Sequence, residues 1–131
     1  MQLLKRFSLV LAIVGMSMQI PTVHALAVSE AMLNSHLNQR LMASVDLLAV
    51  SPEELDSLVV FIRPMDESRG ASLSWPKIKH EVVSDKSGRH RIQLTSDEPI
   101  REPVVNFVLE LSWSGGRLER EYVLLIDPDS D

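Results

Sequence analysis

Residues 98–128 are the most informative part of the chain for its fold and read EPIREPVVNFVLELSWSGGRLEREYVLLIDP. It opens with a corner held by Pro99 and Pro103, because proline fixes φ and cannot donate to a strand ladder. A long apolar segment follows, then a Ser-Gly-Gly turn and a second segment of strand character. This order predicts an antiparallel hairpin.

The first strand of this hairpin, residues 104–113, is expected to lie in the middle of its sheet. Phe107, Leu109 and Leu111 share one face, by the period of two that extended backbone imposes. The opposite face is only partly polar, since it carries Val108. Apolar residues on both faces indicate a strand that is covered on both sides.

The return strand, residues 117–126, contains one conflict with its own pattern. Tyr122, Leu124 and Ile126 share a face, and strict alternation places Arg120 on that same apolar face. A β-bulge near Arg120, or an exposed start to the strand, is expected to resolve the conflict.

Shorter segments upstream complete an all-β pattern. Strands are expected at residues 26–33, 41–50, 59–62, 77–83 and 89–95. One short helix is expected near Ser51–Ser57, because Ser51 can cap it, Pro52 suits its first position and Glu54 completes a capping box. The fold prediction is a single antiparallel β-sandwich with one short helix, and with an immunoglobulin-like topology.

The N-terminal residues have the order of a secretory signal peptide. Lys5 and Arg6 precede an apolar run at residues 7–18, which is too short to span a membrane, and Pro21 precedes a small-residue site. Cleavage is expected after Ala25. The predicted organisation is therefore a signal peptide at 1–25, one sandwich domain at 26–131 and a periplasmic location. A buried N-terminal helix or an uncleaved anchor is the alternative.

Composition excludes several classes of function. The formal net charge is −5, and it becomes more negative once Lys5 and Arg6 are removed, which argues against nucleic acid or anionic lipid as a partner. The chain has no cysteine, so it has no disulfide, thiol nucleophile, thiolate metal site or lipid-modified cysteine. After signal cleavage no membrane span is expected.

The sequence supports no metal site, cofactor site or catalytic residue. His36, His80 and His90 lack ligand spacing. His80 and His90 could face each other across the 77–95 hairpin, but a zinc site needs a third ligand, so both are interpreted as core or boundary residues. There is no Gly-x-Ser-x-Gly elbow and no glycine-rich phosphate loop. The remaining carboxylate clusters are interpreted as a helix start and a solvated tail: Glu53, Glu54, Asp127, Asp129 and Asp131.

Polar residues at the predicted corners leave binding open. Lys79 and Glu81 are expected on the solvated face of their hairpin, opposite Arg91 and Gln93. Arg101 and Glu102 are interpreted first as a structural corner in which Arg101 pairs with a nearby carboxylate. Loops on rigid scaffolds do carry binding, and the irregular segments 34–40 and 65–76 are the candidate surfaces. An exposed sheet edge could also accept a partner strand.

Three stretches occur in order along the chain. The first is residues 35–41, SHLNQRL, similar to a pattern S-x-L-N-Q-P-L, and the second is residues 47–55, LLAVSPEEL, a capped helix. The third is the opening stretch, with Glu98-Pro99-x-Arg101-Glu102-Pro103, Asn106-Phe107, Trp113, Gly116-Arg117, Arg120-Glu121-Tyr122 and Asp127-Pro128. Together they resemble the N-terminal periplasmic domain of the FimV/HubP family, bacterial inner-membrane proteins linked to type IV pili and cell-pole organisation.

This resemblance covers residues 26–128 and implies a non-catalytic periplasmic interaction module. The implied role is in type IV pilus assembly and twitching motility, or in cell-pole and envelope organisation. The implied partner is a periplasmic or inner-membrane protein, pilus assembly components among them. Family members also carry a peptidoglycan-binding LysM module, a transmembrane helix and a cytoplasmic region. None of these occurs in the sequence, so peptidoglycan binding is not implied.

The sequence departs from the family pattern at two places and leaves two other functions open. Arg40 stands where the family usually has proline, and residues 26–29 lack a glycine-rich entry. One alternative is an exported chaperone-like sandwich that donates or accepts a strand. The other is a small exported enzyme, which would need a concave cluster of histidine or carboxylate side chains.

Overall fold

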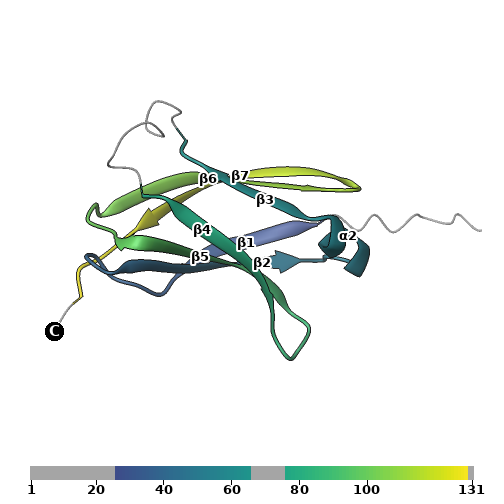
Figure 1. The fold of residues 1–131 in the computed structure, drawn as a ribbon, viewed down its shortest axis with the longest axis horizontal. Helices are drawn as coiled ribbons and strands as arrows, with labels where there is room; N and C mark the ends of the chain where they lie inside the picture. The colour runs from purple at the N-terminus through teal and green to yellow at the C-terminus, as the bar shows by residue number, and fades with distance from the viewer. Residues whose placement is uncertain (1–25, 66–75, 130–131) are drawn as a thin grey trace, which may run out of the picture.

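The computed structural model describes residues 26–65 and 76–129. They form two antiparallel sheets packed face to face (Figure 1). In chain order the elements are β1 (Ala27–Leu33), β2 (Arg40–Leu48), α2 (Pro52–Ser57), β3 (Val59–Arg63), β4 (Ile78–Ser84), β5 (His90–Pro99), β6 (Val104–Trp113) and β7 (Gly116–Leu125). The predicted signal peptide and nearly all of the segment 65–76 lie outside the described residues.

The order of the strands identifies the topology. The larger sheet runs β1-β2-β5-β4 and the smaller sheet runs β3-β6-β7. In an immunoglobulin constant-type domain the first, second, fifth and fourth strands likewise form one sheet, and the third, sixth and seventh form the other. The predicted all-β sandwich and its immunoglobulin-like topology are both confirmed.

The core lies between the sheets and follows the alternation of the sequence. In β2 the inward residues are buried and those between them are more exposed; the inward set is Leu41, Ala43, Val45 and Leu47. β2 ends at Leu48, two residues before the predicted end. The reason is Ala49, whose φ of 55° lies in the left-handed region and turns the chain out of the strand.

β6 is the central strand of the smaller sheet, as predicted. Phe107 is fully buried, and its ring stacks on that of Tyr122 with 5.4 Å between centroids. Val108, on the opposite face of β6, is also buried. Removing one such aromatic side chain from water contributes about 2–3 kcal/mol, and the opening stretch of the sequence supplies both buried aromatic residues of the described core.

The helix α2 connects the two sheets and begins where the sequence predicts. The Ser51 hydroxyl accepts a hydrogen bond from the Glu54 N–H at 3.2 Å, and the Ser51 N–H donates to the Glu54 carboxylate at 3.1 Å. These two hydrogen bonds confirm the predicted capping box, and Pro52 occupies the first turn as expected. The Ser57 hydroxyl accepts from the Ser114 N–H at 3.0 Å, which joins the helix to the β6–β7 turn.

The conflict at Arg120 is resolved without a bulge. The β6–β7 pairing has no register shift, so the predicted bulge is wrong. The start of the strand is mostly exposed, as the alternative expected, and the Arg120 side chain is one-third exposed. Arg120 stays on the Tyr122 face, with its guanidinium carbon 5.1 Å from the centre of that ring. Its charged end then reaches the other sheet.

The β4–β5 hairpin forms where predicted, but its outward pairs differ. They are Lys79 with Thr95, Glu81 with Gln93 and Val83 with Arg91. Only the Glu81–Gln93 pair agrees with the prediction. Lys79 instead forms an ion pair with Asp97 at 2.7 Å, diagonally across the hairpin.

Candidate interaction surface

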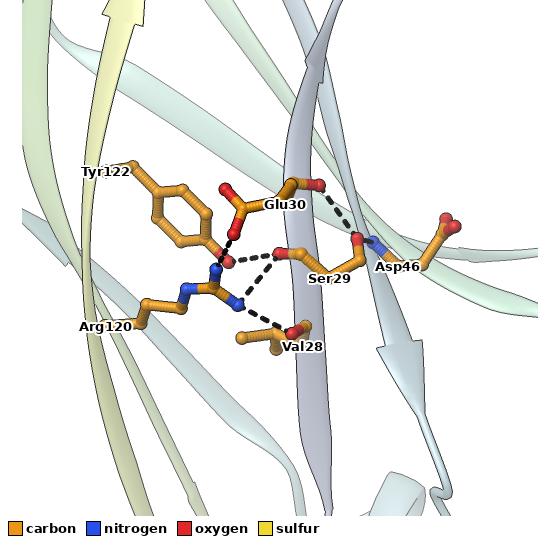
Figure 2. A network of polar contacts seen from close by, with 6 residues as sticks. All are labelled: Val28, Ser29, Glu30, Asp46, Arg120 and Tyr122. Carbon is orange, nitrogen blue, oxygen red and sulfur yellow. Dashed lines mark hydrogen bonds and ion pairs between the residues drawn. The ribbon is translucent and has the colours of Figure 1, made fainter.

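Arg120 and Tyr122 join the smaller sheet to the first strand of the larger one (Figure 2). Arg120 Nη1 donates to the carbonyl oxygens of Val28 at 2.8 Å and Ser29 at 3.3 Å, and Nη2 pairs with the Glu30 carboxylate. The Tyr122 hydroxyl donates to the Ser29 carbonyl at 2.7 Å. We call these five residues the inter-sheet network.

The carbonyls of Val28 and Ser29 accept side-chain donors because β1 bulges here. The pairing with β2 shifts by one residue, so that Ser29 and Glu30 together lie opposite Asp46. The Ser29 hydroxyl accepts from the Asp46 N–H at 2.9 Å and donates to the Glu30 carbonyl at 2.8 Å. The inter-sheet network thus supplies side-chain donors to carbonyl groups at the point where the β1–β2 ladder is irregular.

The inter-sheet network has a structural role rather than a catalytic one. Burial raises the pKa of Tyr122 above its ordinary value, and the smaller opposing effect is the positive charge of Arg120. A phenol with a raised pKa remains a neutral donor at physiological pH. Tyr122 is also almost completely buried, so its hydroxyl holds β1 in place and has no access to a substrate.

Two stretches singled out in the sequence meet at one end of the sandwich. They are the loop after β1 and the corner after β5. The Asn38 N–H donates to the Ile100 carbonyl at 2.7 Å, and the Ile100 N–H donates to the Gln39 carbonyl at 2.9 Å. The Leu37 N–H donates to the Asp127 carbonyl, beyond β7, at 2.9 Å. Backbone hydrogen bonds therefore hold this end of the molecule together.

Two buried serines stabilise the same end. The Ser96 hydroxyl accepts from the Leu41 N–H at 2.8 Å and donates to the Glu98 carbonyl at 2.7 Å, where the β2–β5 pairing is irregular. The Ser35 hydroxyl accepts from the Met42 N–H at 2.9 Å. Both serines are buried, so each hydrogen bond also avoids an unsatisfied polar group.

Exposed polar side chains cover this end, and we call them the loop-end surface: His36, Asn38, Gln39, Arg40, Arg101 and Glu102. The expected pairing of Arg101 with a carboxylate is wrong for the described residues, where Arg101 forms no ion pair. The corner itself is structural, as predicted, because Ile100 is buried beneath it. The loop-end surface therefore combines a rigid backbone with exposed side chains that can contact a partner. The other candidate segment, residues 66–75, lies outside the described residues.

A cluster of charges on the outer face of the smaller sheet was not predicted. Arg63 pairs with Glu110 at 2.8 Å and Glu119 at 3.0 Å, and Arg117 lies 3.5 Å from Glu110. The hydrogen bond from Arg63 is the largest cause of a lowered pKa at Glu110. The cluster balances its own charges, so it offers no site of one sign. Alternating Glu and Arg positions in β7 were the only signal in the sequence.

The histidines do not converge on a metal site. His36 lies on the loop after β1, His80 lies opposite Leu94, and His90 lies opposite Ser84. The expectation that His80 and His90 could face each other is therefore wrong, and His80 is exposed rather than a core residue. Across residues 26–65 and 76–129, no group of three or more metal-ligating side chains occurs.

One serine–histidine contact was missed by the sequence reading. Ser84 Oγ lies 2.6 Å from His90 Nδ1, at the base of the β4–β5 hairpin. The neighbouring carboxylate of Asp85 accepts from the Ser87 hydroxyl at 2.6 Å and the Arg89 N–H at 3.0 Å. The pKa of Asp85 is lowered by these hydrogen bonds, and the one from the Ser87 hydroxyl is the largest cause. The Asp85 carboxylate thus shapes the turn through hydrogen bonds from Ser87 and Arg89 rather than from the imidazole, so the three groups form no relay.

The remaining carboxylate clusters have simple positions. Glu53 and Glu54 lie in the first turn of α2, as predicted. Asp127 and Asp129 are exposed after β7, and Asp131 lies outside the described residues. In the part of the chain that the structure describes, no helix has the length and apolarity needed to cross a membrane.

These features define an immunoglobulin-like sandwich domain with a rigid, polar loop end. Residues 26–129 match the family model described as the FimV N-terminal domain, an Ig-like domain, and the chain belongs to this family. Two relatives from two strains of Pseudomonas aeruginosa are both named motility hub protein FimV. Each is 33% identical over 109 residues, which cover 80% of this chain but only 12% of the relative.

Proposed function

We propose that this chain is a periplasmic, non-catalytic interaction module that binds a protein of the cell envelope and acts in type IV pilus assembly and motility. The observation that carries the proposal is the family match over residues 26–129, together with the name motility hub protein in the relatives. The signal-like order of residues 1–25 supports export. A role in cell-pole or envelope organisation is the closest alternative.

The loop-end surface is the proposed binding surface. Asn38 and Ile100 are fixed by backbone hydrogen bonds, so little backbone entropy is lost when a partner binds. Arg101 and Glu102 are exposed beside them. We expect the partner to be an envelope protein that presents complementary charges to these two side chains.

The binding surface is tested by in vivo crosslinking and twitching assays in the bacterium that encodes the chain. Deletion should reduce twitching, and the wild-type chain should restore it. Arg101→Glu should lower recovery of the crosslinked partner by about tenfold, the scale of one lost charged contact. Lys86→Glu, at the exposed tip of the β4–β5 hairpin, makes the same charge change away from the surface and should behave as wild type. Unchanged twitching after deletion, with no envelope protein captured, would contradict the proposal.

Export is tested separately. A fusion of the full chain to alkaline phosphatase, which is active only outside the cytoplasm, should show activity. Mass spectrometry of the purified chain should find Leu26 as the first residue. An uncleaved, inactive fusion retained in the cytoplasm would show that the proposed location is wrong.

One observation favours the strand-accepting alternative. β4 pairs with β5 on one side, and the described residues supply no strand for its other side. A chaperone-like sandwich would use such an edge to bind a segment of another protein.

A further inference from the structure

The edge of β4 that no described strand pairs with is regular enough to accept a strand. Its seven residues pair with β5 in one continuous register, with no bulge or proline between Ile78 and Ser84. β4 and β1 are the two outer strands of the larger sheet. A regular edge with free N–H and C=O groups is a template for a further strand.

The turn of the hairpin shows which residues direct their backbone groups outward. The Asp85 N–H donates to the Arg89 carbonyl at 2.9 Å, in the same register as the rest of the hairpin. Hydrogen-bonded and non-hydrogen-bonded pairs alternate along an antiparallel ladder. Counting back from Asp85, the N–H and C=O groups of Ile78, His80 and Val82 therefore face away from β5.

We infer that this edge pairs with the β4 edge of a second copy of the chain, antiparallel, with the two-fold axis at His80. This arrangement pairs the outward backbone groups with each other. It places Ile78 opposite Val82 of the second copy. On the outer face it places Lys79 opposite Glu81 of the second copy, twice in each dimer.

Charge selects this register over its neighbours. An axis at Lys79 would place two lysines directly opposite each other, and an axis at Glu81 would place two glutamates opposite each other. Like charges in directly opposed positions are destabilising. The ion pair between Lys79 and Asp97 does not block the contact, because the Lys79 side chain is 62% exposed and its ammonium has three donors.

Burial supports the same pairing. Val82 faces the interior side of the larger sheet, opposite the fully buried Ile92, yet it is 37% exposed. Ile78 packs against the core but is only partly buried. The second copy would cover both side chains and continue the larger sheet across the axis.

The β1 and β7 edges fit a second copy less well. β1 has a bulge whose carbonyls are occupied by Arg120 and Tyr122. The Ile126 N–H donates to the Pro103 carbonyl, so the same alternation turns the backbone groups of Glu119 and Glu121 in β7 outward. Self-pairing of β7 about its middle would bring glutamates together.

A charge-swap experiment on the full chain, purified as the host cell processes it, tests the dimer by sedimentation equilibrium. Lys79→Glu and Glu81→Lys should each weaken the dimer about tenfold, because each creates two like-charge pairs. The double variant should restore the wild-type dissociation constant, and so should an equimolar mixture of the two single variants. The test is independent of the pilus role, because it needs only the purified protein.

The control is Lys86→Glu at the hairpin tip, which should leave the dimer unchanged. A wild-type chain that stays monomeric up to about 1 mM would overturn the inference. So would single variants that dimerise as well as wild type, since the contact would then lie elsewhere. A monomer that binds an extended peptide through β4 would favour the strand-accepting alternative instead.

A crosslink provides the second measurement, since the chain has no cysteine of its own. His80→Cys should form a disulfide-linked dimer under mild oxidation, because opposed residues at the axis have Cα atoms about 5.5 Å apart. Disulfides span roughly 4.4–6.8 Å between Cα atoms. Lys86→Cys should crosslink far more slowly, and equal rates for the two variants would count against the inference.

Discussion

The two outer strands of the larger sheet, β1 and β4, form edges of different kinds. β1 is bulged at Ser29 and Glu30, and Arg120 and Tyr122 of the other sheet bind its carbonyls. β4 is regular, and no described strand lies beyond it. The difference shows that one edge is closed by backbone irregularity and side-chain donors, whereas the other keeps the regular geometry that strand pairing needs.

The open edge is nevertheless protected against indiscriminate pairing. β4 alternates Lys79 and Glu81 on its outer face, and charged residues on an edge strand oppose contact with most other strands. The same charges favour the one register in which opposite signs meet. A closed edge and a charge-selective edge therefore permit one specific contact and discourage general aggregation.

The largest expected effect comes from Tyr122→Ala on the closed side. Loss of the buried ring beside Phe107 should lower the free energy of unfolding by about 3–5 kcal/mol. Urea unfolding monitored by tryptophan fluorescence measures it. Tyr122→Phe keeps the ring and loses only the hydroxyl bond to Ser29, so it should lower the same quantity by about 1 kcal/mol. If Tyr122→Ala lowered the free energy of unfolding by less than about 3 kcal/mol, the contacts of Tyr122 would not be a main determinant of stability.

Arg120→Met should destabilise the chain by about 2 kcal/mol. The change leaves the carbonyls of Val28 and Ser29 without their charged donor and removes the contact with the Tyr122 ring. Arg117→Met is the matched control on the same strand. Its ion pairs are long and its side chain is 66% exposed, so about 0.5 kcal/mol or less is expected. Equal losses for the two variants would show that the inter-sheet network adds nothing specific.

Alkaline pH should lower the free energy of unfolding by ionising Tyr122. Because burial raises the pKa of Tyr122, the unfolded chain ionises at lower pH than the folded chain. The stability contributed by the neutral phenol is present below pH 10 and is lost as pH rises above about 10, the pKa of an unfolded tyrosine. The chain has one tyrosine, so phenolate absorbance reports this group alone. Tyr122→Phe should remove this component of the pH dependence, and a phenolate midpoint at or below 10 would contradict it.

The smallest expected effect on stability is that of a substitution in β4. Val82→Thr keeps the shape and β-branching of a side chain that is already partly exposed, so the monomer should change by about 0.5 kcal/mol or less. Hydrogen exchange distinguishes monomer from dimer here. The His80 amide should exchange more slowly as protein concentration rises, whereas the β1 amides should not respond. A concentration-independent His80 amide would leave β4 as an unpaired edge.

The elements could be predicted from the sequence, whereas their contacts could not. Alternation located β2 and β6, and Ser51 with Glu54 located the helix, because these signals lie within a few residues of each other. Strict alternation placed Arg120 on the Tyr122 face, but the predicted bulge was wrong and the partners of Arg120 were missed. Ser29 lies 93 positions from Tyr122 in the chain, and no local pattern reports a contact at that separation.

The residues of the loop-end surface could be predicted from the sequence, whereas the contacts between them could not. The sequence singled out the Ser35–Leu41 stretch and the Glu98–Pro103 corner, because their polar and proline-rich composition interrupts the strands. It did not indicate that Asn38 and Ile100 join the two through backbone hydrogen bonds. The Ser84–His90 contact and the true partner of His80 also depended on a hairpin register that composition leaves undetermined.

Periodicity, caps and motifs are properties of neighbouring residues, so they were enough to predict the fold class, the capped helix and the family. The choice of which edge of the larger sheet is closed could not be predicted from them. That choice depends on a one-residue bulge in β1 and on side chains that reach it from β7. Both arise when distant strands pack, because a buried carbonyl requires a donor wherever in the chain that donor comes from.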